Sequence, residues 1–246
     1  RDVRAREPDL GRARELPAAP GEHVAEERPE RLLRHALLAH GVEGRAAEVR
    51  ERRGGQGRGA EDAGRVEDQR DALLAGGEQA CDPHNEGSGP LPAHRSIIFD
   101  VFPRSASNRY FADMSRTVVR GTPSPELKRL YQTVLDAQEE AITKIKDGAD
   151  GKRIHQGILR RFEKAGYQTG LVNGRMQGYF HGTGHGVGLD IHEMPRISRT
   201  GSLLQEGHVV TVEPGLYYRG LGAVRIEDMV LVTKDGCRNL TNSPKI

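Results

Sequence analysis

The 246-residue chain has no tryptophan, two cysteines and an aromatic content of 4%. Because Cys81 and Cys237 cannot make a disulfide framework, a reducing compartment is expected, and the cytoplasm is the predicted location. The chain contains no apolar run of about 18 residues, so no membrane span is predicted. The N-terminus lacks the apolar centre of a signal peptide. The formal net charge is +2, with Arg interleaved among Glu and Asp. This pattern gives no basic patch for nucleic acid.

Residues 1–80 lack ten amino-acid types: Ser, Thr, Asn, Lys, Ile, Met, Phe, Tyr, Trp and Cys. All five Phe and all six Tyr lie at or after Phe99, and the first Lys is Lys128. A segment without Ile or aromatic residues has little from which to build a core. The plain interpretation is a low-complexity extension rich in Arg, Ala, Gly and Glu, disordered or partly helical, with helix-forming stretches at 30–38 and 70–75.

A second interpretation of residues 1–80 rests on the genetic code. The ten types present all have codons that begin with G or C, whereas every codon of the ten missing types begins with A or T. In a GC-rich gene the third codon position is nearly always G or C, and a shifted or reversed frame can make that position the first. We therefore hypothesise that much of residues 1–80 is an out-of-frame translation.

From Cys81 onward the ordinary signals of a folded domain return, and residues 81–246 are predicted to form one catalytic domain. Apolar and β-branched runs predict strands at 96–102, 110–119, 208–212 and 223–233. Helices are expected to begin after the N-caps Ser124 and Asp150 and to end at Gly148 and Gly166. A strand pair, two helices and further strands predict an α+β fold with a mainly antiparallel sheet.

Four carboxylates fall in or beside these apolar strands: Asp100, Asp113, Glu213 and Glu227. A buried charge without a partner is very costly, so their positions call for cations. Two divalent ions would balance four carboxylates, and His185, in a glycine-rich stretch, would complete the ligand set. Such ligands suit Mn, Co, Fe or Zn without choosing among them. Each residue alone also has a structural explanation, such as a turn at Glu213-Pro-Gly.

The five residues occur in five motifs: Phe-Asp100-Val-Phe-Pro-Arg, Ala-Asp113-Met-Ser-Arg-Thr, His181-Gly-Thr-Gly-His185-Gly-Val-Gly-Leu-Asp-Ile-His192-Glu, Thr-Val-Glu213-Pro-Gly and Val-Arg225-Ile-Glu227-Asp. Together these motifs resemble the M24 metallopeptidases, and within them the Xaa-Pro peptidases, aminopeptidase P and Xaa-Pro dipeptidase. The resemblance covers about residues 81–246. It implies the pita-bread fold, here with an incomplete or anomalous N-terminal half, and a large exposed apolar surface is the expected consequence.

The resemblance also implies the metal chemistry. Asp100 would chelate one ion, Asp113 and Glu227 would bridge two, and His185 and Glu213 would hold the other. The cofactors would be two divalent metal ions, with manganese preferred and cobalt, iron or zinc as alternatives. A hydroxide bridging the metals would attack the scissile carbonyl. Glu213 would also shuttle a proton to the leaving amine.

Four further residues receive roles from the same resemblance. His181 and His192 would bind the substrate or polarise its carbonyl, and His84 would lie on the substrate side. Arg225 would orient the carboxylates from outside the ligand set. The partner would be a peptide with proline at its second position, a homodimer is a candidate assembly, and neither nucleic acid nor membrane is expected.

Two rival functions stay open. A creatinase-like hydrolase uses the same fold without metals, and an inactive or non-enzymatic pita-bread binding module needs no metal ligands. The intact set of five ligands argues against both. His94 and His155 lie outside the motifs and are expected to be structural or exposed to solvent.

The out-of-frame hypothesis predicts that the protein purified from its natural source yields no peptides from residues 1–80 as written. Peptide mass spectrometry and resequencing of the gene are the measurements. Fragments that cover this segment, together with an intact reading frame, would contradict the hypothesis.

Overall fold

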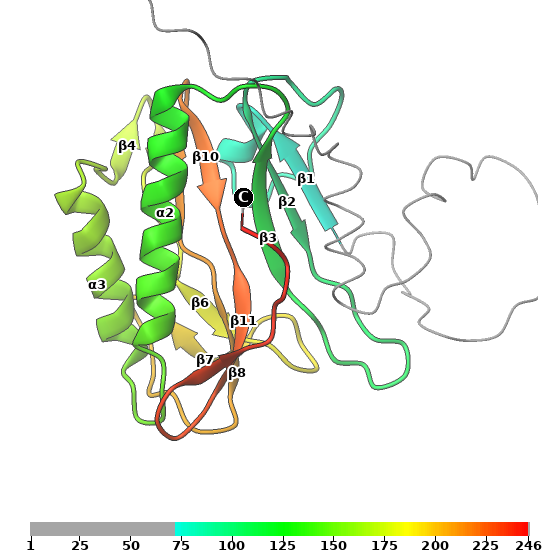
Figure 1. The fold of residues 1–246 in the computed structure, drawn as a ribbon, viewed down its shortest axis with the longest axis vertical. Coiled ribbons are helices and arrows are strands. Elements are labelled where there is room, and N and C mark those ends of the chain that lie inside the picture. Colours follow the sequence, from blue (N-terminus) through cyan, green and yellow to red (C-terminus); the bar gives the residue numbers. More distant parts are fainter. Residues whose placement is uncertain (1–71, 246) are drawn as a thin grey trace, which may run out of the picture.

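The computed structural model describes residues 72–245 (Figure 1). The out-of-frame hypothesis therefore concerns mostly residues outside this range, and the helix-forming stretch at 30–38 lies wholly outside it. Residues 72–80, which the sequence analysis assigned to the N-terminal segment, take part in the fold. They form strand β1 (Ala72–Gly76) and a 3-10 helix, η2 (Gln79–Cys81).

The prediction of a helix-forming stretch at 70–75 is wrong for residues 72–75, because they belong to β1. β1 pairs antiparallel with β2 (Ser96–Val101), and Ala75 is buried. Leu and Ala are good helix formers, but pairing with a neighbouring strand overrides a weak local preference. The strand at the edge of this sheet therefore comes from sequence that reads locally as helix.

The first sheet has the order β1-β2-β3, with β3 spanning Met114–Val119. β2 and β3 pair antiparallel as predicted, and Asp100 lies opposite Ser115. β3 is shorter than the strand expected at 110–119, because residues 110–113 belong to a loop. In that loop Arg104 and Phe111 form an isolated bridge.

Two helices, α2 (Pro125–Thr143) and α3 (Gly151–Lys164), lie side by side on one side of the strands (Figure 1). Both predicted N-caps are confirmed. Ser124 Oγ accepts a hydrogen bond from the Leu127 backbone N–H at 3.1 Å, and Asp150 Oδ1 accepts one from the Lys152 N–H at 2.8 Å. Both chain reversals after the helices use a glycine at positive φ, Gly148 and Gly166.

The larger sheet has the order β12-β11-β8-β6-β7, and all of its pairs are antiparallel. Its strands are β6 (Gly184–Gly186), β7 (Glu193–Ile197), β8 (Val209–Val212), β11 (Asp228–Val232) and β12 (Cys237–Asn239). Two hairpins complete the described fold: β4 (Gly170–Val172) with β5 (Arg175–Gln177), and β9 (Gly215–Tyr218) with β10 (Gly222–Arg225).

The strand expected at 223–233 is broken into β10 and β11. β10 packs on the first sheet, where the Ala223 N–H donates to Ser96 Oγ at 3.0 Å and the Arg225 N–H to Thr117 Oγ1 at 2.9 Å. β11 continues into the larger sheet. The break at residues 226–227 is therefore the junction of the two sheets, and it carries Glu227.

The main core lies between the helices and the strands, and it includes Leu130, Val134 and Ile158, all fully buried. Beside it, α2 and β3 border a largely apolar groove of about 570 Å³. Within this groove the buried hydroxyl of Tyr131 has no hydrogen-bond partner among the described residues. No helix within residues 72–245 combines the length and the apolar character needed to cross a membrane.

Gly184 is the position at which β6 approaches β8 most closely. A Cβ placed there would lie 1.9 Å from the Thr211 carbonyl oxygen, far inside contact distance. We expect Gly184→Ala to push β6 away from β8 and to lower the free energy of unfolding by roughly 1–3 kcal/mol. Urea unfolding followed by circular dichroism measures this loss.

Gly170→Ala is the matched control, because a Cβ at that strand position meets nothing within 4 Å. Equal unfolding midpoints for the two variants would show that close approach at Gly184 does not constrain the sheet.

Candidate metal centre

The two aspartates enter the site from the first sheet. Asp100 is the fifth residue of β2, and Asp113 directly precedes β3. Asp113 is 5% exposed and the side chain of Asp100 is 14% exposed, so both carboxylates are largely removed from water. The antiparallel pairing of β2 with β3 brings them to the same end of this sheet.

His185 enters the site from β6 of the larger sheet, with one ring nitrogen free to act as a ligand. Its Nδ1 lies 3.0 Å from the Gly186 carbonyl oxygen. A carbonyl only accepts, so Nδ1 carries the proton and Nε2 presents a lone pair. Nε2 faces Asp113 Oδ2 at 3.6 Å and Glu213 Oε1 at 3.4 Å. The ring is therefore oriented as a metal-binding histidine would be.

The two glutamates follow strand ends. Glu213 comes directly after β8, and its backbone N–H donates to the Thr183 carbonyl at 2.7 Å. Glu227 occupies the break between β10 and β11 and is 2% exposed. Ser115 holds it twice, because Ser115 Oγ donates to Glu227 Oε2 at 2.8 Å and the Ser115 carbonyl accepts from the Glu227 N–H at 3.0 Å.

The five predicted ligands converge, although not equally. One ligand atom from each of Asp113, His185 and Glu227 lies within 4.8 Å of the others. Glu213 joins this group through its 3.4 Å approach to His185 Nε2. Asp100 is linked to it through Arg225, whose Nη2 donates to Asp100 Oδ2 at 2.7 Å.

Arg225 is a buried cation that holds several parts of the site at once. Its Nε donates to Ser115 Oγ at 2.8 Å, and its Nη1 donates to the Pro83 carbonyl at 3.1 Å and to Tyr217 Oη at 3.3 Å. The guanidinium therefore contacts Asp100 directly and Glu227 indirectly, because Ser115 in turn donates to Glu227. These contacts support the orienting role expected of Arg225, which stays a prediction.

Burial and mutual repulsion disturb the protonation of the acidic groups. Burial first, and then the charges of Asp100 and Glu213, raise the pKa of Asp113 well above its usual range. Burial and the charge of Asp113 do the same to the pKa of Glu227. Burial raises the pKa of Glu213 to about 7. Without a cation the site therefore takes up protons near neutral pH.

One buried atom fits the presence of a metal directly. Asp100 Oδ1 is buried and has no hydrogen-bond partner among residues 72–245, although its other oxygen is bound by Arg225. An unpaired buried carboxylate oxygen is costly. A cation within reach of this oxygen would satisfy it, and the mixed oxygen and nitrogen donors of Asp113, His185 and Glu227 suit a divalent transition metal.

His181 and His192 lie beside the cluster in different states. His181 Nδ1 lies 2.8 Å from the Gly182 carbonyl, which makes Nδ1 the donor, and Nε2 therefore accepts from Tyr217 Oη at 2.9 Å. Both nitrogens of His181 are thus occupied. His192 stacks edge-on against His185 with ring centroids 4.4 Å apart, and it has no hydrogen-bond partner among the described residues. Burial lowers the pKa of both His181, to about 3, and His192.

His84 lies outside the cluster. It is exposed in the loop after η2, and no described hydrogen bond joins its ring to the ligands. A charge on His84 is among the smaller causes that lower the pKa of His181 and of His192. The predicted substrate-side role stays a prediction.

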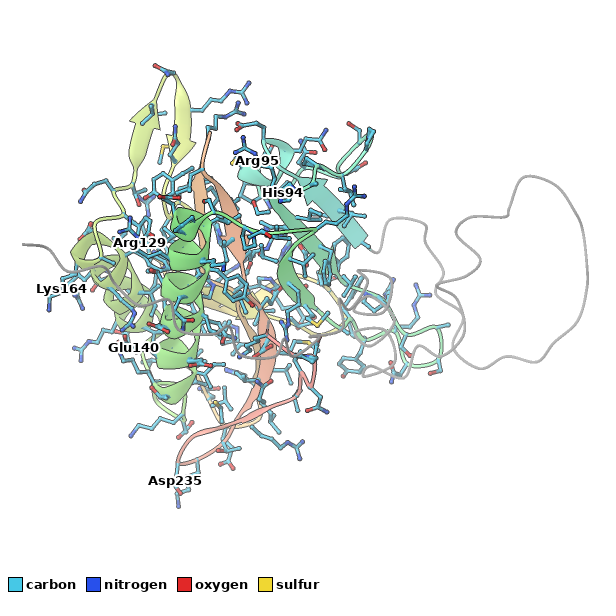
Figure 2. All side chains as sticks on the ribbon, turned by 45° about the horizontal axis from the view of Figure 1, so that its top comes forward. His94, Arg95, Arg129, Glu140, Lys164 and Asp235 are labelled. Carbon is cyan, nitrogen blue, oxygen red and sulfur yellow. The ribbon has the colours of Figure 1, made fainter. Side chains whose placement is uncertain are left out.

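The two histidines outside the motifs differ in burial. His94 lies at the exposed rim near Arg95 (Figure 2), with Nδ1 3.1 Å from the Thr122 carbonyl. His155 is buried in α3, and its Nδ1 lies 3.1 Å from Tyr179 Oη and 3.0 Å from Thr183 Oγ1. His155 therefore braces the loop that carries His181.

Three residues that support the site received no role from the sequence: Ser115, Tyr217 and Asp228. Ser115 and Asp228 stand within two of the quoted motifs, and the need of buried polar groups for hydrogen-bond partners is the signal that could have identified them. Tyr217 contacts His181 from 36 positions away, and no local signal predicts this contact.

Comparison with known proteins identifies the family of the chain. A family model described as metallopeptidase family M24 matches residues 25–234. Xaa-Pro dipeptidase from Pyrococcus furiosus is 35% identical over 177 residues, which make up 71% of this chain and 48% of that protein.

Two solved structures share the fold. The X-Pro aminopeptidase from Thermotoga maritima has a TM-score of 0.64 and 35% identity over 72% of this chain and 48% of that one. The prolidase from Pyrococcus horikoshii has a TM-score of 0.64 and 34% identity over 71% of this chain and 48% of that one. The chain thus spans about half the length of the relatives it matches. The predicted α+β pita-bread fold and the resemblance to Xaa-Pro peptidases are confirmed.

The raised carboxylate pKa values predict an unusual pH dependence for the metal-free protein. Between the unfolded pKa of a glutamate, about 4.3, and the value of about 7 for Glu213, the folded state binds more protons than the unfolded state. The contribution of the Glu213 carboxyl to the free energy of unfolding is therefore fully present below pH 4 and is lost as pH rises through 7. We expect the free energy of unfolding in EDTA to fall by roughly 2–3 kcal/mol between pH 5 and pH 8.

Excess Mn²⁺ should reverse this fall at pH 8, because a ligand that binds the folded state stabilises it. Calorimetric unfolding across this pH range, with EDTA or MnCl₂, is the measurement. In Glu213→Gln the fall should be smaller. Metal-free stability that rises from pH 5 to pH 8 would contradict the burial of uncompensated carboxylates.

Proposed function

Because the chain belongs to metallopeptidase family M24, we propose that it is a dinuclear-metal-dependent exopeptidase that hydrolyses Xaa-Pro peptide bonds. The observation that carries this proposal is the buried convergence of Asp113, His185 and Glu227, with Glu213 and Asp100 beside them. The relatives named Xaa-Pro dipeptidase and X-Pro aminopeptidase support the substrate class. A non-enzymatic module or a metal-free creatinase-like hydrolase would leave these buried carboxylates without a partner.

In this proposal Asp100 would chelate one ion, His185 and Glu213 would hold the other, and Asp113 and Glu227 would bridge both. Manganese is the preferred metal, and cobalt, iron and zinc have compatible chemistry. When bound, the ions lower the pKa of a water molecule and so supply a nucleophile at neutral pH.

Glu213 is the residue best suited to move a proton. Burial raises its pKa to about 7, close to the pH at which the protein would work, so that it can both accept and donate. Its Oε1 accepts a hydrogen bond from Thr211 Oγ1 at 3.4 Å, and this bond orients the carboxylate. The proton from the attacking water would pass to an oxygen of Glu213 and then to the leaving amine.

His192 is a better candidate than His181 for contact with the substrate carbonyl. His192 is exposed and its ring nitrogens are free, so one of them can donate to the developing oxyanion. His181 can donate from Nε2 only if Tyr217 releases it and Nε2 takes up a proton. A direct role for His181 therefore requires this hydrogen bond to rearrange when substrate binds.

The proposal predicts that Glu213→Gln loses turnover while the fold is retained. The amide can neither take up the proton nor carry the negative charge that binds metal, so kcat should fall by at least about 10²–10⁴-fold. Release of alanine from Ala-Pro and from a longer Ala-Pro-Xaa peptide, with Mn²⁺ present, is the measurement, and it also distinguishes dipeptidase from aminopeptidase preference.

Glu206→Gln is the matched control, because Glu206 is exposed in the loop before β8 and should be dispensable. Near-normal turnover by Glu213→Gln would remove Glu213 from its proposed role. A folded parent protein that binds no stoichiometric Mn²⁺ would overturn the metallopeptidase proposal itself.

A further inference from the structure

Asp228, the residue after Glu227, has a buried carboxylate with several donors. It is 0% exposed. Its four donors are Arg116 Nη2 at 2.8 Å, Gln138 Nε2 at 3.1 Å, Asn239 Nδ2 at 2.9 Å and Lys245 Nζ at 2.7 Å. Although burial disfavours its charge, Arg116 and Lys245 hold the pKa of Asp228 below its usual range. The group is therefore a satisfied buried ion cluster, built partly from the end of the chain.

Arg116 connects this cluster to the backbone of Glu227. Its Nη1 donates to the carbonyls of Ser115 and Glu227, its Nη2 also donates to the Ser243 carbonyl at 2.8 Å, and its Nε donates to the Pro244 carbonyl at 3.0 Å. One buried guanidinium thus joins β3, the candidate bridging ligand and the C-terminal residues.

The C-terminal tail, defined here as residues 239–245, is itself tied to β11. The Leu240 N–H donates to the Met229 carbonyl at 2.9 Å, and the Met229 N–H donates to Thr241 Oγ1 at 3.0 Å. Figure 1 shows the red C-terminal segment turning back across β11 and running beside β3. The tail therefore lies beside β3, which carries Ser115, and against β11, which directly follows Glu227.

Glu227 and Asp228 face different surroundings. The Glu227 carboxylate reaches Ser115 Oγ and the metal cluster, whereas the Asp228 carboxylate reaches Arg116 and Lys245. Successive side chains of extended backbone point to opposite faces. An anchor on Asp228 therefore fixes the backbone from which Glu227 projects, without entering the metal site.

We propose that the C-terminal tail is a positioning element of the metal centre, in which Lys245 and Arg116 act through Asp228 to keep the Glu227 carboxylate in place for two ions. This inference rests on the proposed function and adds to it an element outside the five ligands. Lys245 touches neither metal nor substrate in this arrangement, and it acts through the Asp228 carboxylate and the peptide before it.

The test is Lys245→Met, which keeps the length of the side chain and removes its charge. We expect the affinity for Mn²⁺, measured by titration calorimetry, to fall by about tenfold, as is typical when a residue that supports a ligand is lost. We expect kcat to fall with little change in KM. In the metal-free protein, hydrogen exchange of the amides of residues 227–232 should become faster.

Two variants serve as controls. Lys234→Met changes an exposed lysine in the turn between β11 and β12 and should leave every readout unchanged. Lys245→Arg should restore Mn²⁺ affinity and slow exchange, because it returns the charge. If Lys245→Met fails to fold, Asn239→Ala carries the same test, since it removes a neutral donor to Asp228.

Unchanged Mn²⁺ affinity in Lys245→Met would overturn the inference, even if exchange becomes faster, because the tail would then be merely structural. A parent protein that binds no Mn²⁺ would overturn the proposed function instead. If Lys245→Met does not change the hydrogen exchange of the amides of residues 227–232 in the metal-free protein, the link from the tail to Glu227 is refuted. This holds whatever the Mn²⁺ affinity of the variant.

Discussion

Repulsion among buried carboxylates is the constraint on which the rest of this structure depends. Asp113 and Glu227 are almost fully buried, and Asp100 and Glu213 lie close enough to raise their pKa values. Arg225 is the buried cation that opposes them, and one positive charge cannot balance four negative ones. Protons or divalent ions must supply the difference.

The fold meets this constraint by taking the candidate ligands from two separate sheets. Asp100 and Asp113 come from β2 and from the residue before β3, whereas His185 and Glu213 come from the larger sheet. Glu227 lies where the chain passes from one sheet to the other. A carboxylate at such a junction lies within reach of side chains from both sheets, as its hydrogen bond with Ser115 and its proximity to His185 show.

Local rules in the sequence predicted much of this architecture. Ser124 and Asp150 cap helices because their side chains satisfy free backbone N–H groups nearby, and Gly148 and Gly166 supply positive φ. The candidate ligands could be proposed because each lies in a short, characteristic motif. What depends only on neighbours along the chain was open to prediction.

The features that escaped prediction depend on contacts between distant residues. β1 forms because β2 offers an edge, which the helix-forming Leu and Ala of residues 72–76 do not reveal. The break at 226–227 depends on Ser115, more than a hundred positions away. The occupied state of His181 depends on Tyr217 in the same way. Long-range partners choose among local preferences that are nearly equal in energy.

Glu227 and Asp228 are adjacent in the chain, but their carboxylates have opposite electrostatic surroundings. On one side, Glu227 faces an excess of negative charge that favours ions or protons. On the other side, Arg116 and Lys245 lower the pKa of Asp228. Their positive charges balance this carboxylate, so it needs no metal ion. If the two carboxylates shared one surrounding, Arg116 and Lys245 would compete with the metals for Glu227. Keeping them on opposite faces lets rigid ionic anchoring support the ligand without neutralising the charge that metal binding requires.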